Sequence, residues 1–245
     1  MTDLVLDADA VAKTVALLSR RIEERFPGSG LSGVCRELDR ITTKTRERAE
    51  WIGRPILSLR ILVALLLVLI AAGLANTAMS LHSPKEPLDP FQFIQVLESG
   101  INDVVLVGAG VFFLLTLETR IKRQRALEAI KELRAIAHII DMHQLTKDPE
   151  WVFAPGSPST LLPERRFSRF QLSRYLDYCS EMLSIAGKLA ALYIQDFDDS
   201  VALDAVNEVE NLTTGLSRKI WQKLMILYQM GPEPTPASHP GTSRD

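Results

Sequence analysis

Two histidines and a carboxylate near the middle of the chain are the residues best suited to chemistry. His138, Asp141 and His143 lie within the segment HIIDMH. On a helix, His138 and Asp141 are one turn apart, and imidazole with carboxylate is a ligand set that suits zinc or similar ions. His143 falls on a different face, and the HExxH spacing of zinc enzymes does not occur here. We therefore expect these metal-site candidates to satisfy one another or to cap a helix end, with no metal and no catalytic role.

A glycine-rich segment, GSGLSG at residues 28–33, matches the GxGxxG pattern letter by letter. A dinucleotide site needs a strand before this pattern, a helix after it and a parallel sheet around it. Residues 20–26 are charged and helical in pattern, and no strand pattern follows. We interpret the segment as a connector between two helices and expect no cofactor.

A basic segment with interleaved aromatic residues follows a proline-rich stretch. It contains Phe167 and Phe170 among four arginines, which are Arg165, Arg166, Arg169 and Arg174. Such clusters bind anionic lipid headgroups or nucleic-acid phosphates. We favour a structure with both phenylalanines in a helical core and the arginines in water. Contact with the inner leaflet is the alternative, and no nucleic acid is expected as a partner.

The first element able to position these groups against a membrane is a long apolar run. No charged side chain occurs from Ile61 to Pro84, and residues 61–75 are apolar throughout. A membrane-spanning helix needs roughly 20 mostly apolar residues to cross about 30 Å of hydrocarbon. The run starts too far along the chain, without a small-residue cleavage site, to be a signal peptide. It predicts a true transmembrane helix.

The second apolar run, residues 104–117, is shorter, and its length alone would also suit a buried core helix. The charge distribution decides between the two. Six basic residues lie between residues 40 and 60, and four more follow the second run, whereas Lys85 is the only basic residue between the runs, among four acidic ones. Short loops rich in Lys and Arg stay in the cytoplasm, so both flanks are predicted inside and the acidic loop outside.

Charged and small residues mark the two predicted spans. Arg60, Glu118 and Arg120 fall at the cytoplasmic boundary, where mutual pairing or snorkelling satisfies charged groups. Along the first span, small residues follow one stripe at helical spacing, namely Ala64, Ala71, Ala75 and Ala78. Such stripes allow helices to approach closely in lipid, so we expect a helix-packing role for this one.

The remaining chain predicts helices that start at Asp7 or Asp9, at Leu31, at Glu164 and at Asp198 or Asp199, and a long cytoplasmic continuation of the second span. Cys35 and Cys179 are expected to be reduced and buried. The fold class is therefore all-α: a two-helix transmembrane hairpin with a cytoplasmic helical bundle built from N- and C-terminal segments. The predicted divisions are N-terminal cytoplasmic helices (1–55), transmembrane helix 1 (56–79), an external acidic loop (80–99), transmembrane helix 2 (100–120), its cytoplasmic extension (121–147), a proline-rich linker (148–163), a C-terminal helical hairpin (164–230) and a disordered tail (231–245).

No P-loop, nucleophile elbow, CxxC pair or paired-carboxylate motif is recognisable. We therefore expect a non-enzymatic, oligomeric, membrane-anchored helical module that recruits or senses a cytoplasmic protein. A two-span pore subunit is the alternative, although neither span carries a polar stripe. A membrane-tethered metal-dependent enzyme using His138 and Asp141 has the least support. The expected location is a bacterial inner (plasma) membrane with both termini cytoplasmic, and the expected partners are the lipid bilayer and further copies of the chain.

Overall fold

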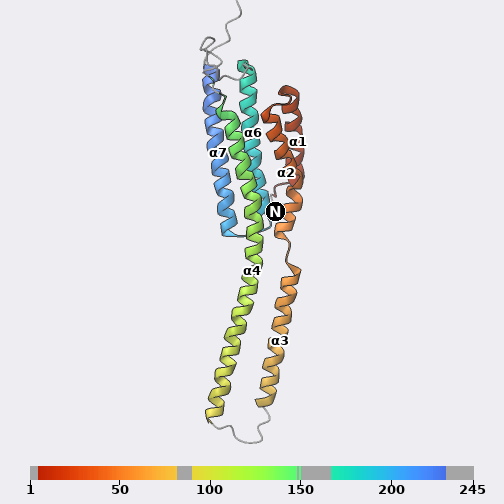
Figure 1. Cartoon of the computed structure of the whole chain (residues 1–245), viewed down its shortest axis with the longest axis vertical. Coiled ribbons are helices and arrows are strands. Elements are labelled where there is room, and N and C mark those ends of the chain that lie inside the picture. The colour runs from red at the N-terminus through yellow and green to blue at the C-terminus, as the bar shows by residue number, and fades with distance from the viewer. Residues whose placement is uncertain (1–4, 82–89, 148, 150–166, 230–245) are drawn as a thin grey trace, which may run out of the picture. The chain divides into compact units, whose positions relative to one another are not determined.

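The computed structural model describes residues 5–81, 90–147, 149 and 167–229, and every regular element within these ranges is a helix. The helices are α1 (Ala8–Arg25), α2 (Gly30–Gly53), α3 (Leu57–Leu81), α4 (Pro90–Leu145), α6 (Arg169–Ile194) and α7 (Ser200–Gln229) (Figure 1). The all-helical class predicted from the sequence is confirmed. The predicted disordered tail and most of the proline-rich linker lie outside the described residues.

The chain divides into two compact units. Unit 1 comprises residues 1–49 and 129–245, and unit 2 comprises residues 50–128. Unit 1 is therefore built from segments at both ends of the sequence, as the sequence predicts for the helical bundle. Helices α2 and α4 each contribute residues to both units.

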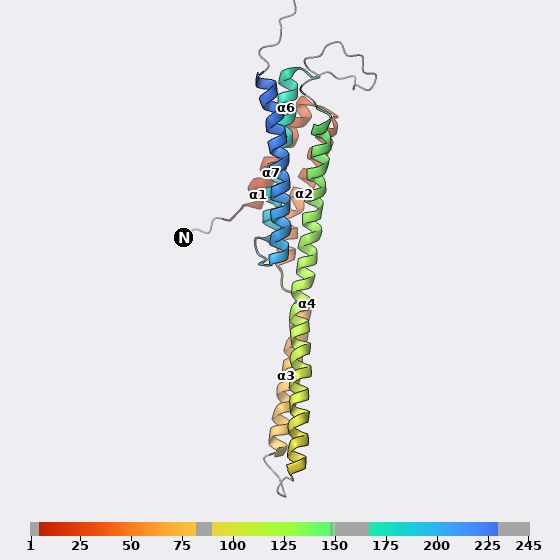
Figure 2. The ribbon, with the colours of Figure 1, turned by 90° about the vertical axis from the view of Figure 1, so that its left-hand side faces the viewer.

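Unit 1 has a core made from the apolar faces of its helices, whose ribbons are drawn in Figure 2. In α1 the buried residues follow one narrow stripe at helical spacing, Val11, Val15, Leu18 and Ile22. The part of α4 in unit 1 buries Ile130, Leu133, Ala137 and Ile140 in the same way. Helix α6 is buried over most of its circumference, from Leu172 to Tyr193, and packs mainly against α7 and also against α1.

Ion pairs join the helices of unit 1 at the edge of this core. Glu132 of α4 pairs with both Arg40 and Arg48 of α2, and the nearby Glu132 raises the pKa of the Arg48 guanidinium. Arg134 of α4 pairs with Glu208 of α7 at 3.1 Å. Exposed pairs of this kind stabilise a fold weakly, so the apolar stripes carry most of the packing energy and the ion pairs add specificity.

The connection between α1 and α2 explains the glycine-rich segment. Asp7 caps α1 by accepting a hydrogen bond from the amide of Asp9, and the chain turns after Arg25. Gly28 has φ = +64°, a left-handed conformation that favours glycine. Glu23 then accepts hydrogen bonds from Ser32 and from the amide of Gly28, and these bonds lower its pKa. Residues 28 and 29 lie between the two helices, whereas residues 30–33 form the first turn of α2, so the connector is shorter than the sequence predicts.

Helix α6 starts later than the predicted Glu164. Its N-cap is Ser168, whose hydroxyl accepts from the amide of Gln171 while the Gln171 side chain accepts from the amide of Ser168. This capping box fixes the first helical residue as Arg169. Helix α7 begins at the predicted place, because Asp199 accepts from the amide of Ala202.

Unit 2 contains the predicted spans. Among the described residues, two helices are long and apolar enough to cross a membrane. The first run corresponds to α3. The second run lies within α4, which begins at Pro90, ten residues before the predicted start, and continues unbroken to Leu145. The predicted continuation of this helix beyond the second apolar run is confirmed.

Candidate functional site

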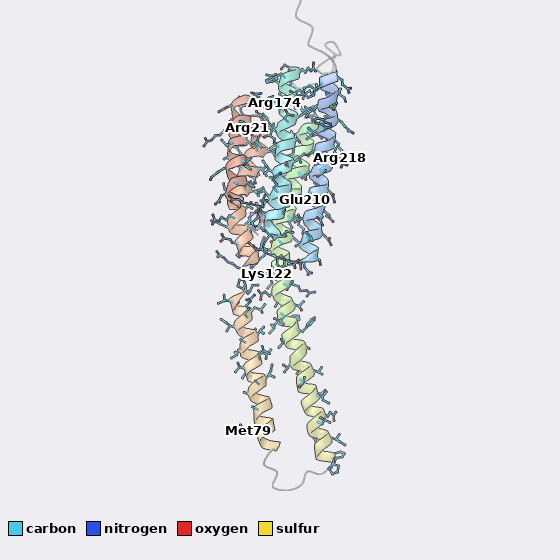
Figure 3. The ribbon with its side chains drawn as sticks, turned by 180° about the vertical axis from the view of Figure 1, so that it is seen from behind. Arg21, Met79, Lys122, Arg174, Glu210 and Arg218 are labelled. Carbon is cyan, nitrogen blue, oxygen red and sulfur yellow. The ribbon has the colours of Figure 1, made fainter. Side chains whose placement is uncertain are left out.

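A group of charged residues lies where the predicted spans end in unit 2. Glu118 of α4 pairs with Arg60 of α3 at 3.3 Å and with Lys122 at 3.1 Å. Its carboxylate also lies 3.4 Å from the amide of Ile56, which donates to it. Lys122 in turn donates to the carbonyl of Gly53 at 3.1 Å and is labelled in Figure 3. Arg60 and Glu118, placed at the cytoplasmic boundary by the sequence, are therefore direct partners.

One turn further along α4, Arg125 lies over an aromatic ring. Its guanidinium carbon is 3.9 Å from the centroid of the Trp51 ring, and it donates to the Trp51 carbonyl at 3.3 Å. Trp51 is 48% exposed. Sequence reasoning missed this contact, although a tryptophan beside clustered arginines at a membrane boundary is a recognisable signal. Arg120 is exposed, and no partner for its side chain is recorded among the described residues.

The predicted helix-packing stripe faces outward over the part that the structure describes. Ala64 lines a hollow of about 300 Å³ between α3 and α4, together with Leu67 and Leu114. Ala71 and Ala75 are exposed, and the side chain of Ala78 lies outside the described part. Among the described glycines of α4, Gly110 is the one that lies near α3, where it faces the side chain of Leu66. This contact does not involve the alanine stripe. The stripe thus has little part in packing the two spans of one chain.

The structure separates His138, Asp141 and His143. His138 is exposed, and Asp141 accepts a hydrogen bond from the side-chain amide of Gln144 at 2.6 Å. His143 is half-buried against Gly30 of α2, and burial, with a contribution from Lys147, lowers its pKa. Within the described residues, no group of three or more His, Cys, Asp or Glu is arranged to hold a metal. The three side chains do not satisfy one another, because His138 is exposed and Asp141 is bonded to Gln144.

A groove of about 850 Å³ lies in unit 1 between α1, α6 and α7. Its floor is one polar face of α6, and its walls are mainly apolar. The floor residues are Asp177, Ser180, Glu181, Ser184 and Lys188, and the walls include Ala10 and Val11 of α1 and Ile220, Trp221 and Leu224 of α7. The size is within the range of ligand pockets, and Trp221, at 61% exposure, is a large uncovered apolar surface.

Charges of both signs line this groove. Arg174 pairs with Asp177 on α6, and Arg21 of α1 pairs with Glu181 at 2.9 Å. Arg21 and Arg174 are labelled in Figure 3. The Lys188 ammonium donates to the Ser184 hydroxyl at 2.7 Å. The sequence missed this groove, because its residues come from three helices that are distant in the chain.

The predicted basic cluster is not a continuous surface within the described residues. Arg165 and Arg166 lie outside them, Arg169 donates to the carbonyl of Tyr228, and Arg174 pairs with Asp177 in the groove. Phe167 packs against Phe26 with ring centroids 5.7 Å apart. The placement of Phe170 in the core is wrong: its ring is 64% exposed, and the guanidinium of Arg25 lies over it at 5.3 Å.

Both cysteines are buried free thiols in unit 1. Burial raises the pKa of the Cys35 thiol and of the Cys179 thiol to about 12. Thiolates are the reactive form of cysteine, so neither residue has the character of a nucleophile near neutral pH.

Comparison with known proteins gives no match: no family model fits the chain, and neither curated proteins nor solved structures show significant similarity to it. The class that the fold defines is an all-helical protein with two candidate membrane-spanning helices. What such a protein does has to be inferred from its own surfaces.

Proposed function

We propose that the protein is a non-enzymatic, membrane-anchored helical module whose cytoplasmic bundle, unit 1, receives a protein partner in the groove between α1, α6 and α7. One observation supports the membrane anchor most strongly. Almost none of the residues in the apolar windows of α3 and α4 are buried within the protein, and large side chains such as Leu65, Val68 and Phe112 face outward. A water-soluble protein rarely exposes a contiguous apolar surface of this extent, whereas lipid would cover it.

The groove supports the recruiting role. A surface used for protein binding characteristically combines large apolar side chains with a polar rim. Trp221 provides such an anchor, and the ion pairs of Arg174 and Glu181 provide polar groups in the same groove. The buried thiols and the separated histidines offer no comparable support for catalysis.

Topology tests the anchor. A reporter that is active only outside the cytoplasm should work when it is fused at residue 87 and should stay silent at residues 50 and 150. Activity at residue 150 would overturn the two-span arrangement.

Site-specific crosslinking tests the groove. A photoreactive amino acid in place of Ser184 or Ser217, both lining the groove, should give a discrete adduct in cells, and Trp221→Ala should reduce its yield. The control position is Asn207, exposed on α7 and outside the groove lining. Equal adducts at all positions, or none at the groove positions, would contradict a partner site there.

We further propose that the protein forms oligomers through the alanine stripe of α3, and a matched pair of variants tests this. Ala71 and Ala72 are adjacent and exposed, but they lie about 100° apart around α3. Ala71→Leu should weaken oligomers in detergent, because a close helix contact cannot absorb the added volume, while Ala72→Leu should not. Mass measurement of the purified variants would settle the subunit number, and identical behaviour would remove the stripe from the interface.

A further inference from the structure

The cytoplasmic ends of the predicted spans carry an excess of positive charge. The two stretches that meet there in unit 2, residues 50–60 and 118–128, contain six basic residues and three acidic ones, an excess of three positive charges. The segment between the spans has the opposite sign, with Lys85 as its only basic residue. Any attraction to anionic lipid is therefore confined to one end of the hairpin.

Four of these six basic residues fall into two groups according to the hydrogen bonds and ion pairs that their side chains make. Arg60 and Lys122 form the first group, whose side chains already make contacts within the protein. Both pair with Glu118, and Lys122 also donates to the Gly53 carbonyl. They hold α4 to the 53–60 segment. Arg120 and Arg125 are the second group, because Arg120 has no recorded partner among the described residues and Arg125 uses one donor on the Trp51 carbonyl. A guanidinium has five N–H donors, so Arg125 keeps most of its capacity.

The ring of Trp51 holds the guanidinium of Arg125 in place. With the guanidinium carbon 3.9 Å from the ring centroid, one flat face of the group is covered by the indole, and its remaining edge N–H groups stay available. A planar guanidinium whose orientation is fixed matches the oxygens of a phosphate in a bidentate manner. An exposed tryptophan is also a residue that favours the headgroup level of a bilayer.

The depth of these residues fits the headgroup layer. On a helix, Arg120 lies about 3 Å and Arg125 about 10 Å along the axis from Glu118. The polar layer on each side of the hydrocarbon is roughly 5–8 Å thick. With the end of the span at Glu118, Arg120 falls inside the layer, and the backbone of Arg125 lies a few Å beyond it, where a long arginine side chain can reach back to lipid phosphates.

We propose that Arg120 on one side of α4, and Arg125 with Trp51 on another side, bind the phosphate headgroups of anionic phospholipids around the helix in the cytoplasmic leaflet. This set of residues, which we call the headgroup collar, rests on the proposed membrane anchoring. It gives unit 2 a preference among lipids, which anchoring by two apolar helices alone does not provide.

Fluorescence quenching of Trp51 tests the headgroup collar. The full-length variant Trp151→Phe/Trp221→Phe keeps Trp51 as its single tryptophan and is reconstituted into phosphatidylcholine vesicles. A minor fraction of the lipid is brominated, either as phosphatidylglycerol or, in a matched sample, as phosphatidylcholine. Quenching by the brominated phosphatidylglycerol should exceed that by the brominated phosphatidylcholine about twofold or more at low salt, and the excess should shrink at high salt.

Two double variants distinguish lipid binding by the headgroup collar from a general effect of positive charge on α4. Arg120→Gln/Arg125→Gln should bring the two quenching values close together. Lys131→Gln/Arg134→Gln, which removes the same charge from the part of α4 in unit 1, should keep the difference. Because each comparison is made within one variant, a change in the intrinsic emission of Trp51 cancels.

Each remaining outcome contradicts a specific statement. Equal quenching by the two lipids in the parent protein would overturn the headgroup collar and leave the membrane anchor intact. Loss of the difference between the two brominated lipids in both double variants would overturn the assignment to Arg120 and Arg125. Absence of quenching by either lipid would overturn the proposed anchoring itself.

Discussion

Units 1 and 2 treat apolar side chains in opposite ways. In unit 1 each outer helix buries a narrow stripe, such as Val15, Leu18 and Ile22 of α1, and exposes charged residues elsewhere. In unit 2 the apolar side chains of α3 lie on all sides of the helix, and Ile61, Leu65 and Val68 are exposed. Apolar side chains are therefore covered by protein in unit 1 and, under the proposed function, by lipid in unit 2.

The largest expected effect comes from removing a buried leucine in unit 1. Leu176 of α6 is fully buried, so Leu176→Ala should lower the free energy of unfolding by about 2–5 kcal/mol through lost burial and a residual cavity. Leu65→Ala in α3 is the matched control. Because the Leu65 side chain faces outward, its loss should change the denaturant midpoint of the detergent-purified protein far less. Equal losses would show that α3 is packed against protein.

An introduced charge should have the opposite effect to the leucine truncations: it should disturb α4 in unit 2 more than α7 in unit 1. Leu106 of α4 is 74% exposed and Leu203 of α7 is 49% exposed. Leu106→Arg should impair membrane insertion, since arginine near the centre of a span costs about 2.5–3.5 kcal/mol, whereas Leu203→Arg should be tolerated because its surroundings are water. The fraction of protein found in the membrane and the activity of the reporter fused at residue 87 measure the insertion of both variants. Normal insertion of Leu106→Arg would place that surface outside the hydrocarbon.

A smaller effect is expected where α2 meets the end of α4 in unit 1. A Cβ at Gly30 would lie 2.4 Å from Cε1 of His143, whereas a Cβ at Gly33 would meet nothing within 4 Å. Gly30→Ala should therefore cost about 1–3 kcal/mol, because the ring must move. Gly33→Ala should be neutral or stabilise by about 0.5–1 kcal/mol, as alanine usually does inside a helix. Chemical unfolding compares the two, and equal midpoints would mean that His143 moves aside freely.

The helices of this protein were predictable because their signals are local. The buried stripe of α1, the Asp7 cap and the helical continuation of the second apolar run each lie within one segment, so periodicity and capping chemistry identify them. The start of α6 was misplaced because the capping box at Ser168 and Gln171 was overlooked in favour of the preceding charged residues. Phe170 was misplaced because apolar character alone does not say that Arg25 occupies the space over its ring.

The candidate sites were less predictable than the helices. The pairing of Arg60 with Glu118 follows from the antiparallel arrangement of two spans whose ends meet, which the charge bias predicts. The contact of Trp51 with Arg125 and the groove beside Trp221 depend on the register between helices that are far apart in the sequence. Such register comes from side-chain packing, and no spacing within one segment records it.

The smallest effect expected is a pH dependence that sharpens the contrast between the units, because it belongs to unit 1 alone. Burial, helped by the charge of Lys147, lowers the pKa of His143 below its ordinary value of about 6.5 in the folded protein. As the pH falls past about 6.5, the unfolded chain binds the proton first, so it binds more protons than the folded chain and stability declines until the folded His143 is protonated too. The unfolding midpoint should therefore be lower at about pH 5.5 than at about pH 7.5, and His143→Gln should show a smaller decline. His138→Gln provides the matched control, since the ring of His138 is exposed, and this variant should follow the parent protein. An undiminished decline in His143→Gln would assign the pH dependence to other groups and would show that the contact of His143 with Gly30 is not coupled to protonation.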